Sequence, residues 1–294
     1  MKRIGYCFII TCLLIAGCAK NEYEPTNGGN FWLKMGDGSI VSTSDIDYYV
    51  GSTHTIYLKK EVPYFKEMGY NHRTMAVYVG NDKIYDCELH SSLSSLIPVG
   101  TTVYPSFFGG TDIIRLNFQP SFYPDSKLTD PRSDRRIITA LKKDRLYHEG
   151  LYCEIQSVSG SNGKLVLNIE LSNPDSFDYY YLDPGKMGIG LFHYFTNGPY
   201  IWGDPYTKTF THQETVVEPV PWDSWKKEWL SRIKSGERKK ISIIYQHFDK
   251  IPAGSYRMSF SFPGLYKVEQ KDRKIGSGRI WMDDIRIEKV ITIK

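Results

Sequence analysis

The chain has 294 residues, of which 37 are Lys or Arg and 33 are Asp or Glu, so its formal net charge is +4. This small excess creates no strong field of one sign, and we therefore expect no nucleic-acid partner. The length, once a leader is removed, suits two domains of ordinary size. The 22 tyrosines and 14 phenylalanines favour β-sheet over helix.

The first 18 residues have the organisation of a secretion leader. Lys2 and Arg3 precede an apolar run, residues 4–16, which is shorter than the roughly 20 residues that a membrane-spanning helix needs. The sequence Leu14-Ile15-Ala16-Gly17-Cys18 resembles a bacterial lipobox. That resemblance implies a signal peptide over residues 1–17, cleavage before Cys18, and attachment of palmitate-type acyl chains at Cys18. An uncleaved anchor helix is the alternative.

Residues 18–30 are polar and contain Pro25, Gly28 and Gly29, which predicts a flexible tether. The segment from Cys18 to Glu24 resembles the acidic export signals of Bacteroidetes-type surface lipoproteins. The resemblance implies attachment to the outer membrane with the protein exposed at the cell surface, so the lipid bilayer is an expected partner. Attachment facing the periplasm is the alternative.

Alternation of apolar and polar residues predicts an N-terminal β domain over residues 31–130. Turn-forming residues separate its segments, for example Gly80-Asn81-Asp82. The expected strands are residues 55–60, 75–80, 83–89, 101–105 and 112–118.

A short helix is expected to link the two domains, within residues 131–149. Ser133 is the expected N-cap, and Gly150 is the expected stop. Ile137 and Leu141 follow helical spacing. The arginines near the start of this helix are expected to pair with neighbouring aspartates, and an anion site is the less favoured alternative.

Alternation resumes in a C-terminal domain over residues 150–294. Asn162-Gly163 lies between two alternating segments and predicts a hairpin. The segment "IPAGSYRM" resembles the tyrosine corner of immunoglobulin-like sandwiches, with Tyr256 as the tyrosine and Met258 at the usual cysteine position. The expected fold is therefore mainly β, with two β-sandwich-type domains of which the second is immunoglobulin-like. Residues 279–293 are expected to form its last strand.

A second helix is expected over residues 221–236, "PWDSWKKEWLSRIKSG". Trp222, Trp225, Trp229 and Ile233 recur at intervals of three or four residues and would form one apolar stripe. Such a stripe is typical of a helix that covers a sheet. A face that binds a partner or lies on a membrane is the alternative.

Two cysteines remain for the folded part. Cys7 and Cys12 lie in the leader and Cys18 in the lipobox, which leaves Cys87 and Cys153. The expected compartment permits a disulfide between them. The pattern around Cys153 favours a small buried core residue instead.

The stretch from Leu191 to Tyr206 is the best candidate for a ligand site. It combines aromatic rings, on which a sugar can stack, with polar groups that can bind hydroxyls. In residues 191–195, the side chains that would point to either face of a strand are apolar, which is typical of a strand buried on both faces. The candidate ligand-binding residues are Asn197, Tyr200, Trp202, Asp204 and Tyr206.

Asp283 and Asp284 are adjacent carboxylates near the end of the chain. Successive strand residues point to opposite faces, so the two cannot act together as a general acid and base. Asp283 falls on the same face of the expected strand as the apolar residues Trp281 and Ile285. A bulge or a strand start is the favoured explanation. The segment "GRIWMDDIRI" also resembles the last strand of jelly-roll carbohydrate-binding modules, which implies that a structural calcium ion could bind here, with Asp283 as the candidate ligand. No other cofactor is expected.

No zinc-protease, dinucleotide-binding or serine-hydrolase motif is present. Residues 45–59 and 180–198 resemble segments of uncharacterised lipoproteins of the same bacterial group, and no activity follows from that. The first hypothesis is a surface-tethered, non-enzymatic binding module whose ligand is a glycan or a surface protein. The alternatives are a structural or adhesive subunit of the fimbrial type, which could donate residues 286–294 to a neighbour, and a hydrolase without a recognisable motif.

Overall fold

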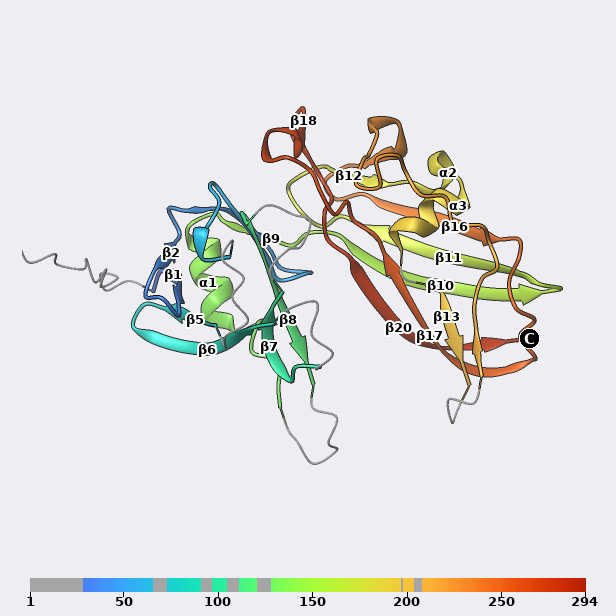
Figure 1. Ribbon diagram of the computed structural model, residues 1–294, viewed down its shortest axis with the longest axis horizontal. Helices are drawn as coiled ribbons and strands as arrows, with labels where there is room; N and C mark the ends of the chain where they lie inside the picture. The colour runs from blue at the N-terminus through green and yellow to red at the C-terminus, as the bar shows by residue number, and fades with distance from the viewer. Residues whose placement is uncertain are drawn as a thin grey trace, which may run out of the picture.

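The computed structural model describes residues 29–65, 73–90, 97–104, 111–120, 128–196, 198–203 and 208–294. The chain is mainly β and contains several sheets (Figure 1). The predicted signal peptide, the lipobox with Cys18 and the tether up to residue 28 lie outside the described residues.

The N-terminal part, residues 31–148, is built on a nine-stranded sheet in the order β2-β1-β5-β6-β7-β8-β4-β3-β9. Each strand expected for this part is present, with ends shifted by one or two residues. The sequence analysis did not predict β1, β2, β3 or β9. The elements are β1 Phe31–Met35, β2 Ile40–Ser42, β3 Ile46–Val50, β4 Thr55–Leu58, the 3-10 helix η1 Pro63–Phe65, β5 Thr74–Val79, β6 Asp82–Leu89, β7 Gly100–Val103, β8 Ile113–Gln119 and β9 Tyr147–His148.

The expected helix is present as α1, Arg135–Lys143, and it belongs to the N-terminal part. Its N-cap is Asp134 rather than Ser133, because the Asp134 carboxylate accepts the backbone amide of Arg136 at 2.8 Å. Ile137, Ala140 and Leu141 of α1 lie in the same hydrophobic core as the strands of the nine-stranded sheet. The helix therefore completes the N-terminal core before the chain crosses to the second part.

The C-terminal part, residues 150–294, contains three sheets, in the orders β10-β11-β16, β15-β12-β19-β18 and β14-β13-β17-β20. Their inward side chains lie in one hydrophobic core. The elements are β10 Tyr152–Ser161, β11 Lys164–Ser172, β12 Tyr179–Leu182, α2 Pro184–Met187, α3 Ile189–Phe195, β13 Tyr200–Trp202, β14 Thr209–Phe210, η2 Lys227–Trp229, β15 Leu230–Ile233, β16 Arg238–Tyr245, β17 Gly254–Phe262, η3 Gln270–Asp272, β18 Lys274–Ile275, β19 Gly278–Ile280 and β20 Ile285–Ile293.

The predicted hairpin is confirmed by β10 and β11. Asn162 and Gly163 both have positive φ, 49° and 80°, as a two-residue turn that matches the twist of its strands requires. Leu165, Leu167, Ile169 and Leu171 of β11 are all buried on one face. The turn and the alternation thus fix the register of this pair together.

The predicted last strand is interrupted. Residues 279–293 form β19, a break at residues 281–284, and β20. β19 pairs with β12, whereas β20 pairs with β17 over its full length. The break includes Trp281, Met282 and Asp283, all of them buried. Asp283 points inward because the chain changes from one sheet to another at this place.

The predicted tryptophan-rich helix is wrong. Residues 221–226 are turn and irregular backbone, residues 227–229 are the 3-10 helix η2, and residues 230–233 are strand β15. β15 pairs with β12 from Leu182↔Leu230 to Tyr179↔Ile233. The backbone groups of this segment find partners in that ladder, so tertiary pairing overrides the helical spacing of the tryptophans.

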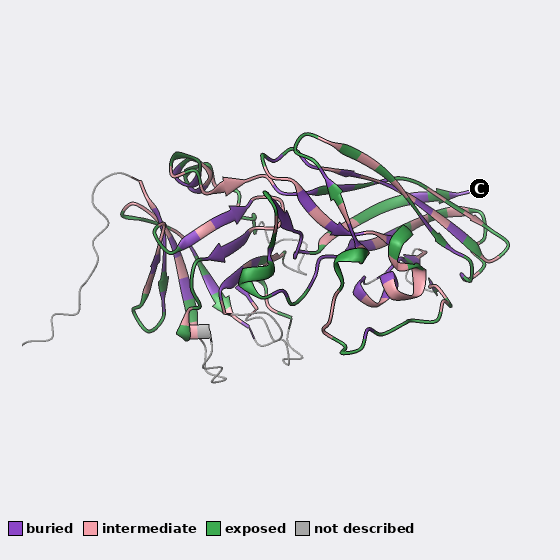
Figure 2. Cartoon of the chain, turned by 90° about the horizontal axis from the view of Figure 1, so that it is seen from above, coloured by how far each residue is buried: buried purple, intermediate pink, exposed green. Residues whose placement is uncertain are grey.

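The two parts share buried surface at their junction. Tyr48, Val50, Tyr57 and Ile113 of the N-terminal part belong to the hydrophobic core of the C-terminal part. Figure 2 shows that buried residues follow the strands, whereas the loops are mostly exposed. The two parts therefore pack as neighbours and are not separated by a linker.

Cys87 and Cys153 are both free and buried. They belong to different hydrophobic cores, one in each part. The disulfide considered from the sequence is therefore absent, and the interpretation of Cys153 as a core residue is confirmed. Burial raises the pKa of the Cys87 thiol to about 12, which keeps it protonated and unreactive at neutral pH.

Candidate functional site: an aromatic hollow beside a polar junction

The predicted ligand-site residues lie only partly within the described chain. Asn197, Asp204 and Tyr206 are outside it, whereas Tyr200 and Trp202 lie on β13. Residues 191–195 form the helix α3 instead of the expected strand. Phe192 and Phe195 on this helix are buried, so their interpretation as core residues is confirmed and only the type of element is wrong.

Tyr200 and Trp202 have the same parity on β13, and Ile201 between them is fully buried. Tyr200 is 43% exposed and pairs with Ser259 of β17, while Trp202 is half-buried and pairs with Arg257. Tyr200 therefore offers a ring at the surface. Much of Trp202 serves packing, and we expect its removal to cost stability.

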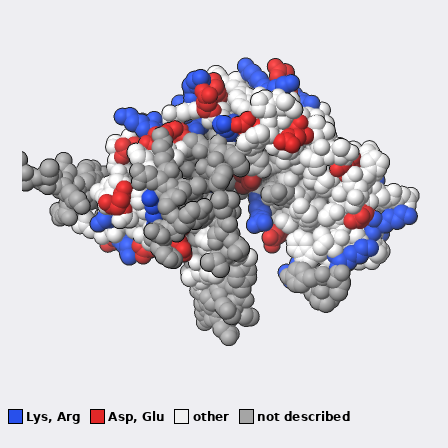
Figure 3. All heavy atoms as spheres, viewed as in Figure 1, with Lys and Arg blue, Asp and Glu red and all other residues white. Residues whose placement is uncertain are grey.

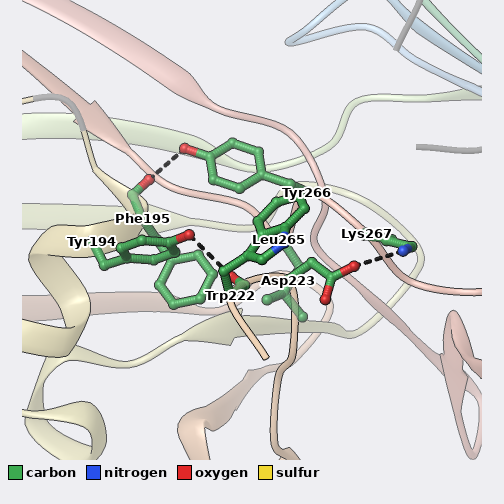
Figure 4. A pocket seen from close by; sticks show the side chains of 7 residues that line it. All are labelled: Tyr194, Phe195, Trp222, Asp223, Leu265, Tyr266 and Lys267. Atoms are coloured by element: carbon green, nitrogen blue, oxygen red, sulfur yellow. Dashed lines mark hydrogen bonds and ion pairs between the residues drawn. The ribbon is translucent and has the colours of Figure 1, made fainter. Parts of the chain in front are cut away.

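A hollow in the surface of the C-terminal part, here called the aromatic hollow, brings together residues from three separate segments. Figure 4 shows them around the opening. It is shallow, with about 20 Å³ of enclosed space, room for about one water molecule. A larger ligand would therefore lie across the hollow. The lining residues are Tyr194, Phe195, Trp222, Asp223, Leu265, Tyr266 and Lys267.

Hydrogen bonds to the backbone fix the tyrosine rings of the hollow. The Tyr194 hydroxyl donates to the carbonyl oxygen of Trp222 at 3.0 Å, and the Tyr266 hydroxyl donates to that of Phe195 at 2.8 Å. The rings of Phe195 and Tyr266 are stacked, with centroids 6.2 Å apart. These contacts hold the rings in place before any ligand arrives.

Two large aromatic side chains of the hollow remain accessible, since Trp222 is 44% exposed and Tyr266 38% exposed. At the rim, Lys267 Nζ lies 2.6 Å from Asp223 Oδ2, and this hydrogen bond lowers the pKa of the Asp223 carboxyl. The hollow thus combines apolar ring surface with a carboxylate that accepts hydrogen bonds and an ammonium group that donates them.

Tyr194 lies within the stretch predicted as a ligand site, but residues 191–195 were interpreted as core. Trp222 was placed on the predicted helix, and Tyr266 was not singled out. The signal that could have found Trp222 and Tyr266 is an aromatic residue beside Pro or Gly in "VPWD" and "FPGLYK", the same signal that drew attention to Tyr200 and Trp202.

Asp283 lies at the junction of the two parts, 2% exposed. Its carboxylate accepts hydrogen bonds from the hydroxyls of Thr53, Thr55 and Tyr57, at 3.1, 3.1 and 2.9 Å, and from Arg115 Nε at 3.2 Å. All four donors belong to the N-terminal part. A buried carboxylate needs such compensation, so Asp283 joins the two parts.

The calcium site expected at Asp283 has no support in this geometry. Three hydroxyls and the Arg115 guanidinium already satisfy both carboxylate oxygens. A cation at this place would meet the positive charge of Arg115. Among the residues that the structure describes, no group of three His, Cys, Asp or Glu side chains is placed to hold a metal ion.

Further polar contacts cross the junction, among them three that involve Arg273, Arg279 and Asp175. Arg273 forms a bidentate pair with Asp112, at 2.7 and 3.0 Å, and both residues are buried. The Arg279 guanidinium carbon lies 4.0 Å from the ring centroid of Tyr48. Asp175 accepts one hydrogen bond across the junction, from His148 Nδ1 at 2.8 Å when that nitrogen carries the proton.

Asp284, next to Asp283, is exposed and accepts the backbone amide of Gly264 at 3.1 Å. Protein on several sides partly desolvates this carboxylate and raises its pKa to about 6. Asp283 cannot serve as its catalytic partner, because its oxygens are already used by Arg115 and the hydroxyls. The prediction that these two carboxylates do not act together is therefore consistent with the geometry.

Acidic and basic side chains are interspersed on the face shown in Figure 3, with no large area of one sign. Among the residues described, no helix combines the length and the hydropathy that a membrane span requires.

Comparisons with known protein families, with curated proteins and with solved structures found no match. The site is therefore interpreted from its own geometry.

Proposed function

We propose that this chain is a lipid-anchored surface protein that binds glycans without catalysis, and that the aromatic hollow is its main contact. The observation that supports this most is the pair of exposed aromatic side chains, Trp222 and Tyr266, beside the Asp223–Lys267 ion pair. A sugar ring presents an apolar face that stacks on such rings and hydroxyls that need both donors and acceptors. Tyr200 on β13 would provide a second stacking surface.

The same proposal includes the architecture predicted from the sequence. Each part would be a domain, and the C-terminal part an immunoglobulin-like sandwich. Two features support the second assignment. The Tyr256 hydroxyl donates to the carbonyl oxygen of Pro252 at 2.9 Å, as a tyrosine corner requires. The two sheets that contain β11 and β17 contribute residues to the same hydrophobic core.

The anchor would be formed by acyl chains on Cys18 at the outer membrane. Several acyl chains together give stable attachment. Palmitate labelling in cells tests this, with Cys18→Ala as the unlabelled control. Protease treatment of intact cells then distinguishes surface exposure, in which the protein is cleaved, from attachment facing the periplasm, in which it is protected.

Calorimetric titration of the full chain in detergent with soluble polysaccharides tests the binding function. The panel would include xylan, mannan, amylopectin, arabinogalactan and homogalacturonan. We expect saturable binding of at least one of them. Tyr152→Ala is a suitable control because Tyr152 is 41% exposed on β10, in another sheet, so its loss should leave the affinity unchanged. Absence of binding across a broad panel would contradict the proposal.

The fimbrial alternative is less well supported by the geometry. β20 pairs with β17 from Gly254↔Ile293 to Phe262↔Ile285, and Ile291 and Ile293 are buried in the chain's own core. Donation of residues 286–294 to a neighbour would remove these side chains from that core. Deletion of β20 should therefore unfold the protein, whereas a donated strand could be removed without loss of the fold.

A further inference from the structure

Two histidines outside the aromatic hollow lie against each other. His193 belongs to α3 and is 7% exposed, while His212 is half-buried and forms an isolated bridge with Phe248. Their ring centroids are 3.4 Å apart. The folding of α3 against the segment that follows β14 thus brings together two imidazoles that are 19 positions apart in the sequence.

The Nδ1 atoms of both rings are buried and have no hydrogen-bond partner in the described part of the chain. The two imidazoles therefore do not satisfy each other. A buried polar atom without a partner costs about 1–3 kcal/mol, and such an atom in a folded protein requires an explanation, for example that it binds an ion. Here two such atoms occur on adjacent rings.

The surroundings favour the neutral form of both rings. Burial lowers the pKa of His193 to about 4, and it lowers the pKa of His212 too. The neutral imidazole is the form that binds metal ions. Glu214 adds a negative charge that acts on both rings, and its Oε1 accepts the backbone amide of His247 at 2.9 Å.

We propose that His193 and His212 bind a divalent transition-metal ion through their Nδ1 atoms. Two nitrogens at about 2.0–2.1 Å from one ion lie no more than roughly 4 Å apart, which is compatible with rings this close. Imidazole ligands favour zinc, nickel and copper over magnesium or calcium. Among the described residues, no third His, Cys, Asp or Glu is placed to bind the same ion. Water would therefore complete the coordination.

A site with two protein ligands should bind more weakly than structural zinc sites with four, and we expect a dissociation constant of roughly 10 µM. This inference does not depend on glycan binding. It places the metal next to Tyr245, whose ring centroid is 6.0 Å from that of His193 and 5.9 Å from that of His212. The ion would connect α3 to the segment between β14 and β16.

The test is calorimetric titration of the untagged full chain in detergent with zinc chloride, and with magnesium chloride as a control. We expect one saturable zinc site and no magnesium site. His212→Ala should weaken zinc binding by at least about 30-fold. His247→Ala, which removes an exposed histidine nearby, should leave the affinity within about twofold of the wild type.

No variant of His193 is used, because His193 is buried and its alanine variant could fail to fold. The second variant is therefore His212→Gln, which keeps most of the side-chain volume of His212. A circular dichroism spectrum like that of the wild type would show that each variant is folded. The proposal is overturned if the wild type shows no saturable zinc binding. It is also overturned if folded His212→Ala and His212→Gln bind zinc as tightly as His247→Ala does.

Discussion

The junction between the two parts and the aromatic hollow use the same kinds of side chain in opposite ways. At the junction, Asp283 and Tyr57 are buried, Arg115 is half-buried, and the Asp283 carboxylate has four donors. In the hollow, the hydroxyls of the two tyrosines are bound to the backbone, but ring surface is left accessible. At the junction, hydrogen-bonded polar groups thus join the two parts of the chain. In the hollow, aromatic rings are fixed in position but stay exposed, so they can contact a ligand.

The largest effect that would distinguish the two regions is expected from Asp283→Ala. The change removes the carboxylate that pairs with Arg115 and leaves the buried hydroxyls of Thr55 and Tyr57 without this acceptor, and we expect a loss of about 3–5 kcal/mol in the free energy of unfolding. Urea unfolding followed by circular dichroism measures it. Asp284→Ala is the matched control, because it removes a single hydrogen bond, from the Gly264 amide, and a carboxylate whose raised pKa shows that its charge does not stabilise the fold, so the variant should not lose this stability at pH 7. Equal losses in the two variants would show that Asp283 has no special role.

A smaller effect is expected at Asp175. Burial pushes the pKa of this carboxyl upward, but hydrogen bonds from His148, Tyr179 and the amide of Gly150 outweigh it, so the pKa lies below its usual 3.8. The stability that this lowered pKa provides is present above the unfolded-state pKa and is lost as the pH falls through the folded-state value. We therefore expect the melting temperature of the wild type to fall as the pH decreases below about 4.

Asp175→Asn checks the origin of that acid sensitivity. At pH 7 the variant should lose about 1–3 kcal/mol, because it lacks the charged acceptor at the junction, and its melting temperature should depend less on pH below about 4. Thermal unfolding from pH 7 to pH 2.5 gives both quantities. An unchanged slope in the variant would mean that other carboxyls cause the acid loss.

The next effect concerns the hollow. Tyr266→Phe removes the hydroxyl that holds the ring against the carbonyl oxygen of Phe195, at a cost of about 1 kcal/mol in stability. Because the ring is then less well fixed, we expect the affinity for the glycan selected from the panel to fall severalfold. Tyr256→Phe loses the same kind of hydrogen bond, to Pro252, and should lose stability without losing affinity.

The sequence predicted features that depend on neighbours along the chain. The hairpin of β10 and β11 follows from Asn162-Gly163 and from alternation, and the core position of Cys153 follows from the same alternation. β1 and β3 were missed because four of the five residues in each strand are buried, on both faces. Such strands lack the alternation that marks a sheet with one exposed face.

The features that failed or were missed depend on distant partners. The tryptophan-rich segment has helical spacing, but its last residues pair with β12, some 50 residues earlier in the chain. The donors to Asp283 lie 168 to 230 residues away from it. The aromatic hollow likewise joins Tyr194, Trp222 and Tyr266 from three segments. No local pattern encodes such contacts, so only the residue types in the hollow could have been anticipated.

The most direct measurement is the effect of Trp222→Ala on glycan affinity and melting temperature, determined on the same preparation. Trp222 is 44% exposed and lines the hollow, so the account predicts that binding of the selected glycan is lost while the melting temperature falls by no more than about 2 °C. A variant that binds the glycan as tightly as the wild type, or one that unfolds as readily as Asp283→Ala, would contradict the account.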